Sequence, residues 1–127
     1  MAQAMLEHVN VTVSDPLQTA QMLCELFDWK IRWQGDAIHD GLTVHVGGDD
    51  SYIAVYAHPD QDAPARESYW TRGGLNHIGI VVDDLDEAER RVKAAGLTPR
   101  SHADYEPGRR FYFDDDDGIE FEVVSYN

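Results

Sequence analysis

Two histidines and one glutamate in this sequence are of the residue types that bind divalent metals. His8 and His77 hold the same position in two similar segments, which lie 69 positions apart. Glu122 lies near the end of the chain, in a stretch where acidic and apolar residues alternate. Two imidazoles and one carboxylate, with further positions left open, form the ligand set of Fe(II) or Mn(II) centres that also bind substrate or oxygen. The residue types therefore predict a metal site made by His8, His77 and Glu122.

The two similar segments are expected to be equivalent strands. Leu6-Glu-His-Val-Asn-Val-Thr-Val-Ser-Asp and Leu75-Asn-His-Ile-Gly-Ile-Val-Val-Asp-Asp-Leu both alternate apolar residues with small or polar ones, which is the period of a β-strand. Each copy has an aspartate, Asp15 or Asp84, before a helix-like stretch, where a short acidic side chain can cap free backbone N–H groups. The sequence therefore predicts two copies of one module, each opening with a strand that carries a histidine.

The same order of elements is predicted after each copy of the strand. In the first module a helix is predicted over 17–27, followed by strands over 29–33, 37–46 and 52–56. In the second module a helix is predicted over 85–95, followed by a strand that begins at residue 98 and by strands over 109–113 and 120–126. Two strand-helix-strand-strand-strand units predict an α+β protein with largely antiparallel sheets. By length, 127 residues form a single domain, with module one over 5–58, a linker over 59–74 and module two over 75–126.

The last strand shows where the two modules differ. Strand alternation places Glu120 and Glu122 on one face. A step of 69 positions back from Glu122 leads to Ile53, with Ala54 beside it, and neither side chain is a ligand. The predicted set therefore has three members, and the place of a fourth ligand is empty.

Composition limits the partners that the protein can have. The formal net charge of −14 argues against binding to nucleic acid or to an anionic membrane, because both would be repelled. No apolar run approaches the roughly 20 residues of a membrane span. The one cysteine, Cys24, cannot form an internal disulfide and fits a reducing cytoplasm. A homodimer is expected, since two small sheets leave much apolar surface to cover.

These motifs, together with Phe111-Tyr-Phe-Asp-Asp-Asp-Asp-Gly-Ile-Glu-Phe-Glu near the end of the chain, resemble those of the vicinal oxygen chelate superfamily. That superfamily contains glyoxalase I, extradiol dioxygenases, methylmalonyl-CoA epimerase, and the fosfomycin and bleomycin resistance proteins. The resemblance covers nearly the whole chain and implies paired βαβββ modules that curl into a cup around a metal. By position it implies His8, His77 and Glu122 as ligands, with Fe(II) or Mn(II) as the metal and Zn or Ni as alternatives.

Differences between individual members favour one kind of chemistry. Glyoxalase I takes a fourth ligand, a glutamate, from the strand that is here Tyr52-Ile-Ala-Val-Tyr, and the epimerase uses a glutamine in the same region. This sequence has neither, and its three-ligand pattern resembles that of extradiol dioxygenases and of the fosfomycin thiol transferases. The net charge of −14 suits the anionic substrate of the fosfomycin enzymes poorly. Their signature has a tyrosine ten residues before the glutamate, as Tyr112 stands before Glu122, and a histidine further upstream, for which His102 is the candidate.

The resemblance assigns two further residues a catalytic role. Tyr112 is expected to give a proton or a hydrogen bond to a metal-bound substrate oxygen, and His102 to act as an acid or base. Arg109 and Arg110 adjoin the strand that bears Tyr112, where one of them could hold a substrate carboxylate, but both are expected to be exposed to solvent.

Two hypotheses of different classes follow. The first is a metal-dependent enzyme that binds two neighbouring oxygens of a small molecule, with oxygenase chemistry on a catechol-like compound placed ahead of lyase or isomerase chemistry of the glyoxalase type. The second is a metal-free protein that sequesters a ligand, like the bleomycin resistance members. In that case aromatic side chains are expected to line the pocket, namely Trp33, Tyr69 and Trp70.

Overall fold

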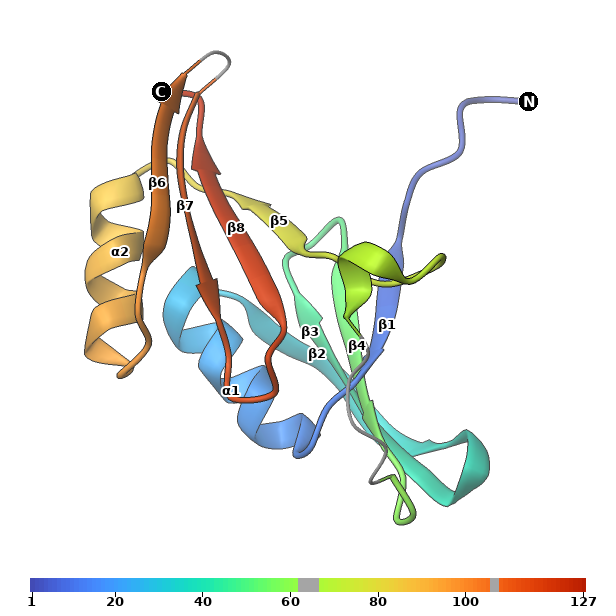
Figure 1. Cartoon of the computed structure of the whole chain (residues 1–127). Coiled ribbons are helices and arrows are strands. Elements are labelled where there is room, and N and C mark those ends of the chain that lie inside the picture. The colour runs from blue at the N-terminus through green and yellow to red at the C-terminus, as the bar shows by residue number, and fades with distance from the viewer. Residues whose placement is uncertain (62–66, 106–107) are drawn as a thin grey trace. The chain divides into compact units, whose positions relative to one another are not determined.

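The structure is a computed structural model, and it describes residues 1–61, 67–105 and 108–127 (Figure 1). Contacts divide the chain into two compact units, Met1–Asp62 and Ala63–Asn127. Residues 62–66 of the predicted linker lie outside the described residues. No helix in the described ranges is long and apolar enough to cross a membrane.

The first unit consists of one strand, one helix and then three strands. These are β1 (His8–Thr12), α1 (Pro16–Phe27), β2 (Lys30–Ala37), β3 (Gly41–Gly47) and β4 (Tyr52–Ala57), with a 3-10 turn η1 (Ile38–Asp40) between β2 and β3. The order across the sheet is β1-β4-β3-β2. β1 runs parallel to β4, and the other neighbouring strands are antiparallel.

The second unit repeats this arrangement after a short 3-10 turn, η2 (Ser68–Trp70). Its elements are β5 (Ile78–Val81), α2 (Leu85–Ala94), β6 (Arg100–Tyr105), β7 (Gly108–Asp114) and β8 (Glu120–Ser125). The order across the sheet is β5-β8-β7-β6, and β5 runs parallel to β8. The two sheets therefore share one topology, and the prediction of an α+β protein with two strand-helix-strand-strand-strand modules is confirmed.

Both helices begin where the sequence predicts. The Asp15 carboxylate accepts a hydrogen bond from the Gln18 backbone N–H at 3.2 Å, and Asp84 accepts one from Glu87 N–H at 3.0 Å. Pro16 takes the first position of α1, where its missing N–H costs nothing because that group would have no helical partner. The two aspartate caps are confirmed, and they fix where each chain segment turns from its first strand into its helix.

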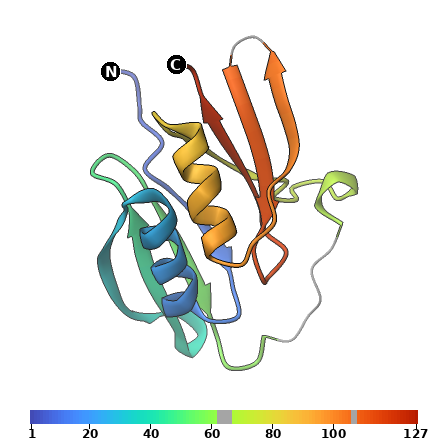
Figure 2. The same cartoon turned by 90° about the vertical axis from the view of Figure 1, so that its left-hand side faces the viewer.

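Each helix covers one face of its own sheet and leaves the other face uncovered. α1 packs on β3 and β4, and α2 packs on β7 and β8 (Figure 2). The helix-facing layers contain fully buried apolar side chains, which are Leu23, Val44, Val46, Val92, Phe111, Phe113 and Val123. Because strand residues alternate between faces, the residues between these positions point away from the helices. Two predicted site residues, Tyr112 and Glu122, are among them, while His77 directly precedes β5.

The aromatic layer under α2 gives a test of this packing. Phe113 is fully buried and stacks on Phe121, with ring centroids 5.1 Å apart. Phe113→Ala is expected to lower the free energy of unfolding by about 3–5 kcal/mol, through lost burial and the cavity that remains. Val81→Ala is the control, because Val81 is 65% exposed, and it should cost less than about 0.5 kcal/mol. Urea unfolding followed by circular dichroism makes the comparison, and small, equal losses would contradict this core.

Candidate metal centre

His77, Tyr112 and Glu122 lie together on the face of the second sheet that α2 does not cover. β8 runs between β5 and β7, so that Glu122 pairs with Gly79 on one side and with Tyr112 on the other. His77 precedes Gly79 by two residues and so shares its face. Its Nε2 atom is 3.7 Å from Glu122 Oε2, and its ring meets the Tyr112 ring edge-on, with centroids 5.9 Å apart.

The Glu122 carboxylate is held from two directions. The Tyr112 hydroxyl donates a hydrogen bond to Oε2 at 2.6 Å, and Arg110 Nη1 donates one to Oε1 at 3.3 Å. Only 15% of the Glu122 side chain is exposed, so these two donors replace the water that the carboxylate loses. The space over Gly79, the neighbour of Glu122 on β5, is open, because a Cβ added to Gly79 would meet no described atom within 4 Å.

Tyr112 is a hydrogen-bond donor at neutral pH. The hydrogen bond to Glu122, together with partial burial and the Glu122 charge, raises the pKa of the phenol to about 12. The hydroxyl therefore keeps its proton several pH units above neutrality. The predicted place of Tyr112 beside Glu122 is observed, and its catalytic role stays a prediction.

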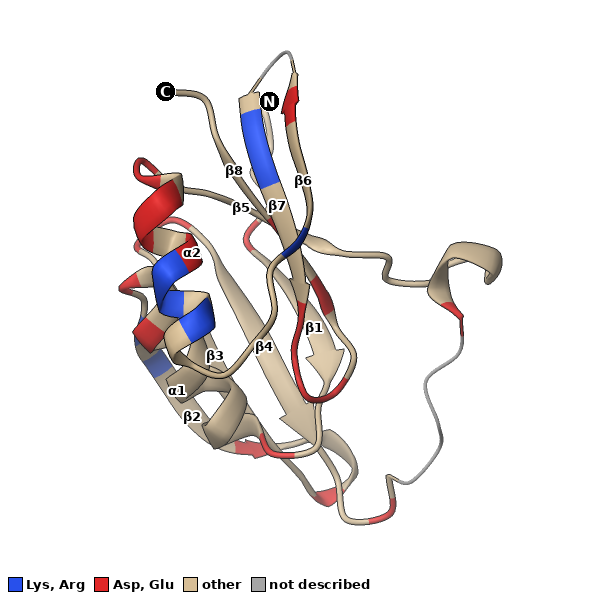
Figure 3. Cartoon of the chain, turned by 60° about the vertical axis from the view of Figure 1, so that its left-hand side comes forward, with Lys and Arg blue, Asp and Glu red and all other residues tan. Residues whose placement is uncertain are grey.

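Arg110 differs from the sequence expectation. Its side chain is 11% exposed, its guanidinium lies over the Tyr105 ring at 4.7 Å, and it pairs with Glu122. Arg109, the next residue toward the N-terminus, is 46% exposed and pairs with Asp86. Figure 3 shows the basic stretch that Arg109 and Arg110 form on β7. Strand alternation explains the difference, because Arg110 shares the face of Tyr112 and Glu122 whereas Arg109 points to the α2 side. The alternation from Tyr112 was the signal that could have placed Arg110 in the site.

The other ring nitrogen of His77 has two partners. Nδ1 is 3.1 Å from the Tyr69 hydroxyl and 3.2 Å from Glu120 Oε2. Tyr69 comes from η2, and its hydroxyl donates a hydrogen bond of 2.5 Å to the same Glu120 oxygen. The shared face of Glu120 and Glu122 is thus confirmed. Tyr69 was noted in the sequence only as an aromatic pocket residue, and its bond to His77 was not predicted.

Glu120 joins this cluster to β6 and β7. Arg100 Nη2 donates hydrogen bonds of 2.8 Å both to Glu120 Oε1 and to Asp114 Oδ1. Partial desolvation raises the pKa of Glu120, but hydrogen bonds from Tyr69 and Arg100 outweigh it and the net shift is downward. Glu120 is therefore an ionised carboxylate at neutral pH. Two arginines, Arg100 and Arg110, thus face the acidic pair Glu120 and Glu122 within the second sheet.

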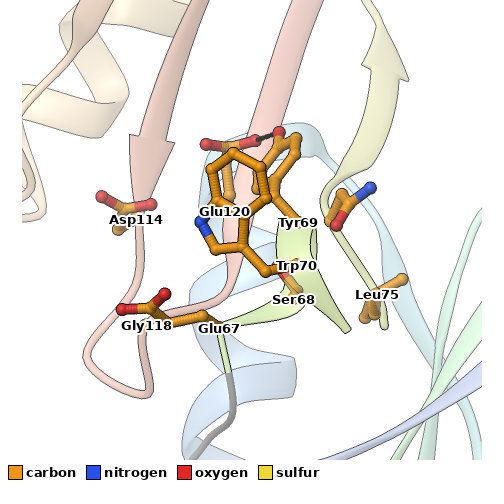
Figure 4. A pocket seen from close by; sticks show the side chains of 9 residues that line it. Glu67, Ser68, Tyr69, Trp70, Leu75, Asp114, Gly118 and Glu120 are labelled. Carbon is orange, nitrogen blue, oxygen red and sulfur yellow. Dashed lines mark hydrogen bonds between the residues drawn. The ribbon is translucent and has the colours of Figure 1, made fainter. Parts of the chain in front are cut away.

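A hollow opens beside this cluster. It has a volume of about 380 Å³ and is lined by η2, the start of the segment before β5, and the hairpin between β7 and β8, through the residues Glu67, Ser68, Tyr69, Trp70, Leu75, Asn76, Asp114, Gly118 and Glu120. In Figure 4 the Trp70 indole stands over the bonded pair Tyr69 and Glu120. Trp70 is 85% exposed, so its ring is free to contact a ligand in this hollow.

In the first unit His8 is the start of a row of rings. Its ring stacks on Tyr52 with centroids 4.8 Å apart, Tyr52 stacks on His45 at 4.5 Å, and His45 lies 5.2 Å from Trp33. His8 Nδ1 is 2.8 Å from Glu7 Oε1, which also accepts a hydrogen bond of 3.3 Å from the Tyr52 hydroxyl. The open face of this sheet is therefore aromatic, whereas that of the second sheet is mainly charged.

The strand register identifies the counterpart of Glu122 in the first unit. Glu122 pairs with Gly79 on β5, and the equivalent residue on β1, Asn10, pairs with Ala54 on β4. The counterpart is thus Ala54 and not Ile53, because the intervening segments differ by one residue in length. Ala54 is 2% exposed and has no donor atom, so this position supplies no fourth ligand, as the sequence predicts.

The structure does not bring His102 to this cluster. His102 Nε2 is 2.5 Å from Glu89 Oε1 on α2, and its ring stacks on Phe111, which belongs to the buried layer under that helix. Tyr112 points to the opposite face of β7. Within the second unit the geometry therefore gives His102 a helix-sheet contact and gives no support to the predicted acid or base role.

His77 and Glu122 are the two predicted ligands that the second unit brings close together. Among the described residues, no group of three or more His, Cys, Asp or Glu side chains is arranged to hold a metal. The prediction that His8 is the third ligand stays a prediction.

The fold and the site together define an α+β protein of two βαβββ modules, with a histidine at the start of the first strand in one and directly before it in the other. A family model described as the Glyoxalase/Bleomycin resistance protein/Dioxygenase superfamily matches residues 5–123. The chain belongs to this superfamily. A comparison with curated proteins found no match.

Solved structures share the fold at low sequence identity. A glyoxylase/bleomycin resistance protein/dioxygenase domain from Frankia sp. EAN1pec has a TM-score of 0.83 and 23% identity, over 98% of this chain and 93% of that one. The fosfomycin resistance protein FosX from Listeria monocytogenes, complexed with Mn(II) and sulfate, has a TM-score of 0.71 and 20% identity, over 97% and 93%. FosX from Mesorhizobium loti has a TM-score of 0.69 and 24% identity, over 94% and 90%.

The two neighbouring arginines on β7 provide a matched test of this site. Arg110→Met leaves the partly buried Glu122 carboxylate without its cation and is expected to lower the free energy of unfolding by roughly 3 kcal/mol. Arg109→Met breaks an exposed ion pair and should cost less than about 1 kcal/mol. Urea unfolding of the metal-free protein measures both. If the two variants lost the same small amount, Arg110 would not hold Glu122 as described.

Proposed function

We propose that this protein is a metal-dependent enzyme in which His8, His77 and Glu122 bind one divalent cation, Fe(II) or Mn(II). A small-molecule substrate would present two neighbouring oxygens to it. The observation that carries the proposal is the 3.7 Å approach of His77 Nε2 to Glu122 Oε2 on an open sheet face, with the remaining polar atoms of both side chains held by other groups.

The chemistry of the donor set fits a divalent cation. Ligand atoms lie roughly 2.0–2.2 Å from such an ion, so two donors 3.7 Å apart can contact the same one. Imidazole nitrogen and carboxylate oxygen are donors that suit Fe(II) and Mn(II). The third donor, His8, belongs to the first unit, and its participation is part of the proposal. The Mn(II) in the FosX structure from Listeria monocytogenes supports the choice of metal.

When bound, the cation would polarise the substrate oxygens and stabilise the negative charge that develops on them. Tyr112 donates its one hydroxyl hydrogen to Glu122 in this structure, and the phenol keeps that proton at neutral pH. To act as the proposed donor, the hydroxyl would turn this hydrogen from Glu122 to a substrate oxygen bound beside it. Arg110 offsets the Glu122 charge and orients the carboxylate. His102 has no part in this scheme, because it faces α2.

The reaction type within the superfamily is proposed from the sequence pattern. A three-ligand set with Tyr112 ten residues before Glu122 resembles the extradiol dioxygenase signature, and this resemblance favours oxygenase chemistry on a catechol-like compound. Lyase or isomerase chemistry of the glyoxalase type comes next. The expectations of a homodimer and of a cytoplasmic location are retained in this proposal.

A second candidate function is ligand sequestration without metal. The exposed Trp70 indole beside the hollow favours it, because a flat ligand could stack there. In that case a ligand would quench Trp70 fluorescence equally well in the parent and in Glu122→Ala.

Metal content separates the two candidates. Protein expressed with iron and manganese available, and purified without chelator, is expected to hold close to one metal ion per chain. Glu122→Ala and His77→Ala should lose most of it, because each removes a ligand. His102→Ala is the matched control and should retain it, since His102 faces α2. The metal content per chain of the parent and of each variant is measured by mass spectrometry. A parent protein without metal would contradict the enzyme proposal.

A further inference from the structure

Both predicted histidine ligands have the same kind of neighbours. In each unit, the Nδ1 atom of the histidine lies against a carboxylate, and that carboxylate also accepts a hydrogen bond from a tyrosine. The trio in the first unit is His8, Glu7 and Tyr52. The trio in the second unit is His77, Glu120 and Tyr69.

The hydrogen bonds of the second trio determine which nitrogen of His77 carries the proton. Tyr69 has a single hydroxyl hydrogen, which it donates to Glu120. Both groups next to Nδ1, the Tyr69 oxygen at 3.1 Å and Glu120 Oε2 at 3.2 Å, can then only accept. An unprotonated Nδ1 would set a lone pair against two acceptors. The favourable arrangement has the hydrogen on Nδ1 and the lone pair on Nε2, the atom nearest Glu122.

The first trio leads to the same tautomer. Glu7 Oε1 is 2.8 Å from His8 Nδ1, and an ionised carboxylate can only accept a hydrogen bond. The Tyr52 hydroxyl donates to the same oxygen, and the Tyr52 ring stacks on the His8 ring. The carboxylate thus sets the tautomer, while the tyrosine sets the plane of the ring.

The two units reach this arrangement from different positions. His8 pairs with Tyr52 on the neighbouring strand. Ile78 pairs with Phe121, so the residue beside His77 is Glu120. The neighbouring strand therefore supplies the tyrosine in one unit and the carboxylate in the other. The third member of the first trio is Glu7, the residue before the histidine, and the third member of the second trio is Tyr69, from η2. The repeated sequence alone does not explain this likeness, because the carboxylate and the tyrosine come from different positions in the two units.

We propose that Glu7 and Glu120 are positioning residues, each with its tyrosine, that fix the histidines as Nδ1–H tautomers and leave Nε2 free to bind metal. This inference rests on the proposed function for its purpose. Carboxylates that accept the second N–H of a ligating histidine orient the ring and make it a better donor, and their loss typically costs 10–100-fold in metal affinity.

Nuclear magnetic resonance of the metal-free, ¹⁵N-labelled protein tests the tautomers directly. Long-range couplings from the ring nitrogens to the carbon-bound ring hydrogens distinguish Nδ1–H from Nε2–H. We expect the Nδ1–H form for neutral His8 and His77. A free imidazole favours Nε2–H, and the exposed His39 provides that reference.

Two variants serve as each other's control. Glu120→Ala should move His77 toward the Nε2–H form and leave His8 unchanged, and Glu7→Ala should do the reverse. Glu120→Gln, whose amide oxygen can still accept from Nδ1–H, should preserve the tautomer of His77. Glu7 is exposed, so its replacement leaves the fold intact and keeps the test valid if Glu120→Ala fails to fold.

Binding of Mn(II) alone gives the second readout. Glu7→Ala and Glu120→Ala should each raise the dissociation constant for Mn(II) by about 10–100-fold. Glu89→Ala breaks an equivalent histidine-carboxylate pair, with His102, and should leave Mn(II) binding unchanged. The Nε2–H form in the parent, or unchanged Mn(II) affinity in both variants, would overturn the inference. A parent with the expected tautomers that binds no Mn(II) would instead overturn the proposed function, and with it the purpose of these pairs.

Discussion

The register of β8 between β5 and β7 is the constraint on which this site depends. It places Glu122 between Gly79 and Tyr112 in one row and puts Glu120 beside His77. A shift of one residue would turn both carboxylates toward α2 and bring Phe121 to the open face. The burial of Phe121 against Phe113 opposes that shift. The apolar core under α2 therefore fixes the positions of the acidic side chains on the other face.

Two partly buried carboxylates on one strand require compensation, and each has its own. Glu122 accepts from Tyr112 and pairs with Arg110, while Glu120 accepts from Tyr69 and Arg100. These donors replace lost hydration. In a chain with a net charge of −14, Arg100 and Arg110 supply the positive charges that face these two carboxylates. The first unit has no such acidic pair on β4 and instead forms a row of stacked rings.

Much of the fold followed from the sequence, because it depends on local patterns. The repeated strand, the caps Asp15 and Asp84, and the shared face of Glu120 and Glu122 all follow from alternation and capping rules. The predicted counterpart of Glu122 in the first unit, Ile53, was one residue from the observed one, Ala54. A fixed step of 69 positions ignores a one-residue difference in segment length. Tyr69 could not be recognised as a partner of His77, because its contact depends on the path of η2. Alternation from Tyr112 could have placed Arg110 beside Glu122, but the sequence does not show which partner an exposed neighbour such as Glu7 takes. His102 matched a pattern in spacing, but its strand turns it toward α2.

The central claim is that one cation is held by one histidine from each unit and by Glu122. Pulsed electron paramagnetic resonance of the protein loaded with Mn(II) tests it most directly, because couplings to ligating ¹⁵N-histidine can be resolved one by one. We expect two coordinated imidazoles in the parent, with one lost in His8→Ala and the other lost in His77→Ala. A spectrum without histidine coupling, or one that His8→Ala leaves unchanged, would contradict it.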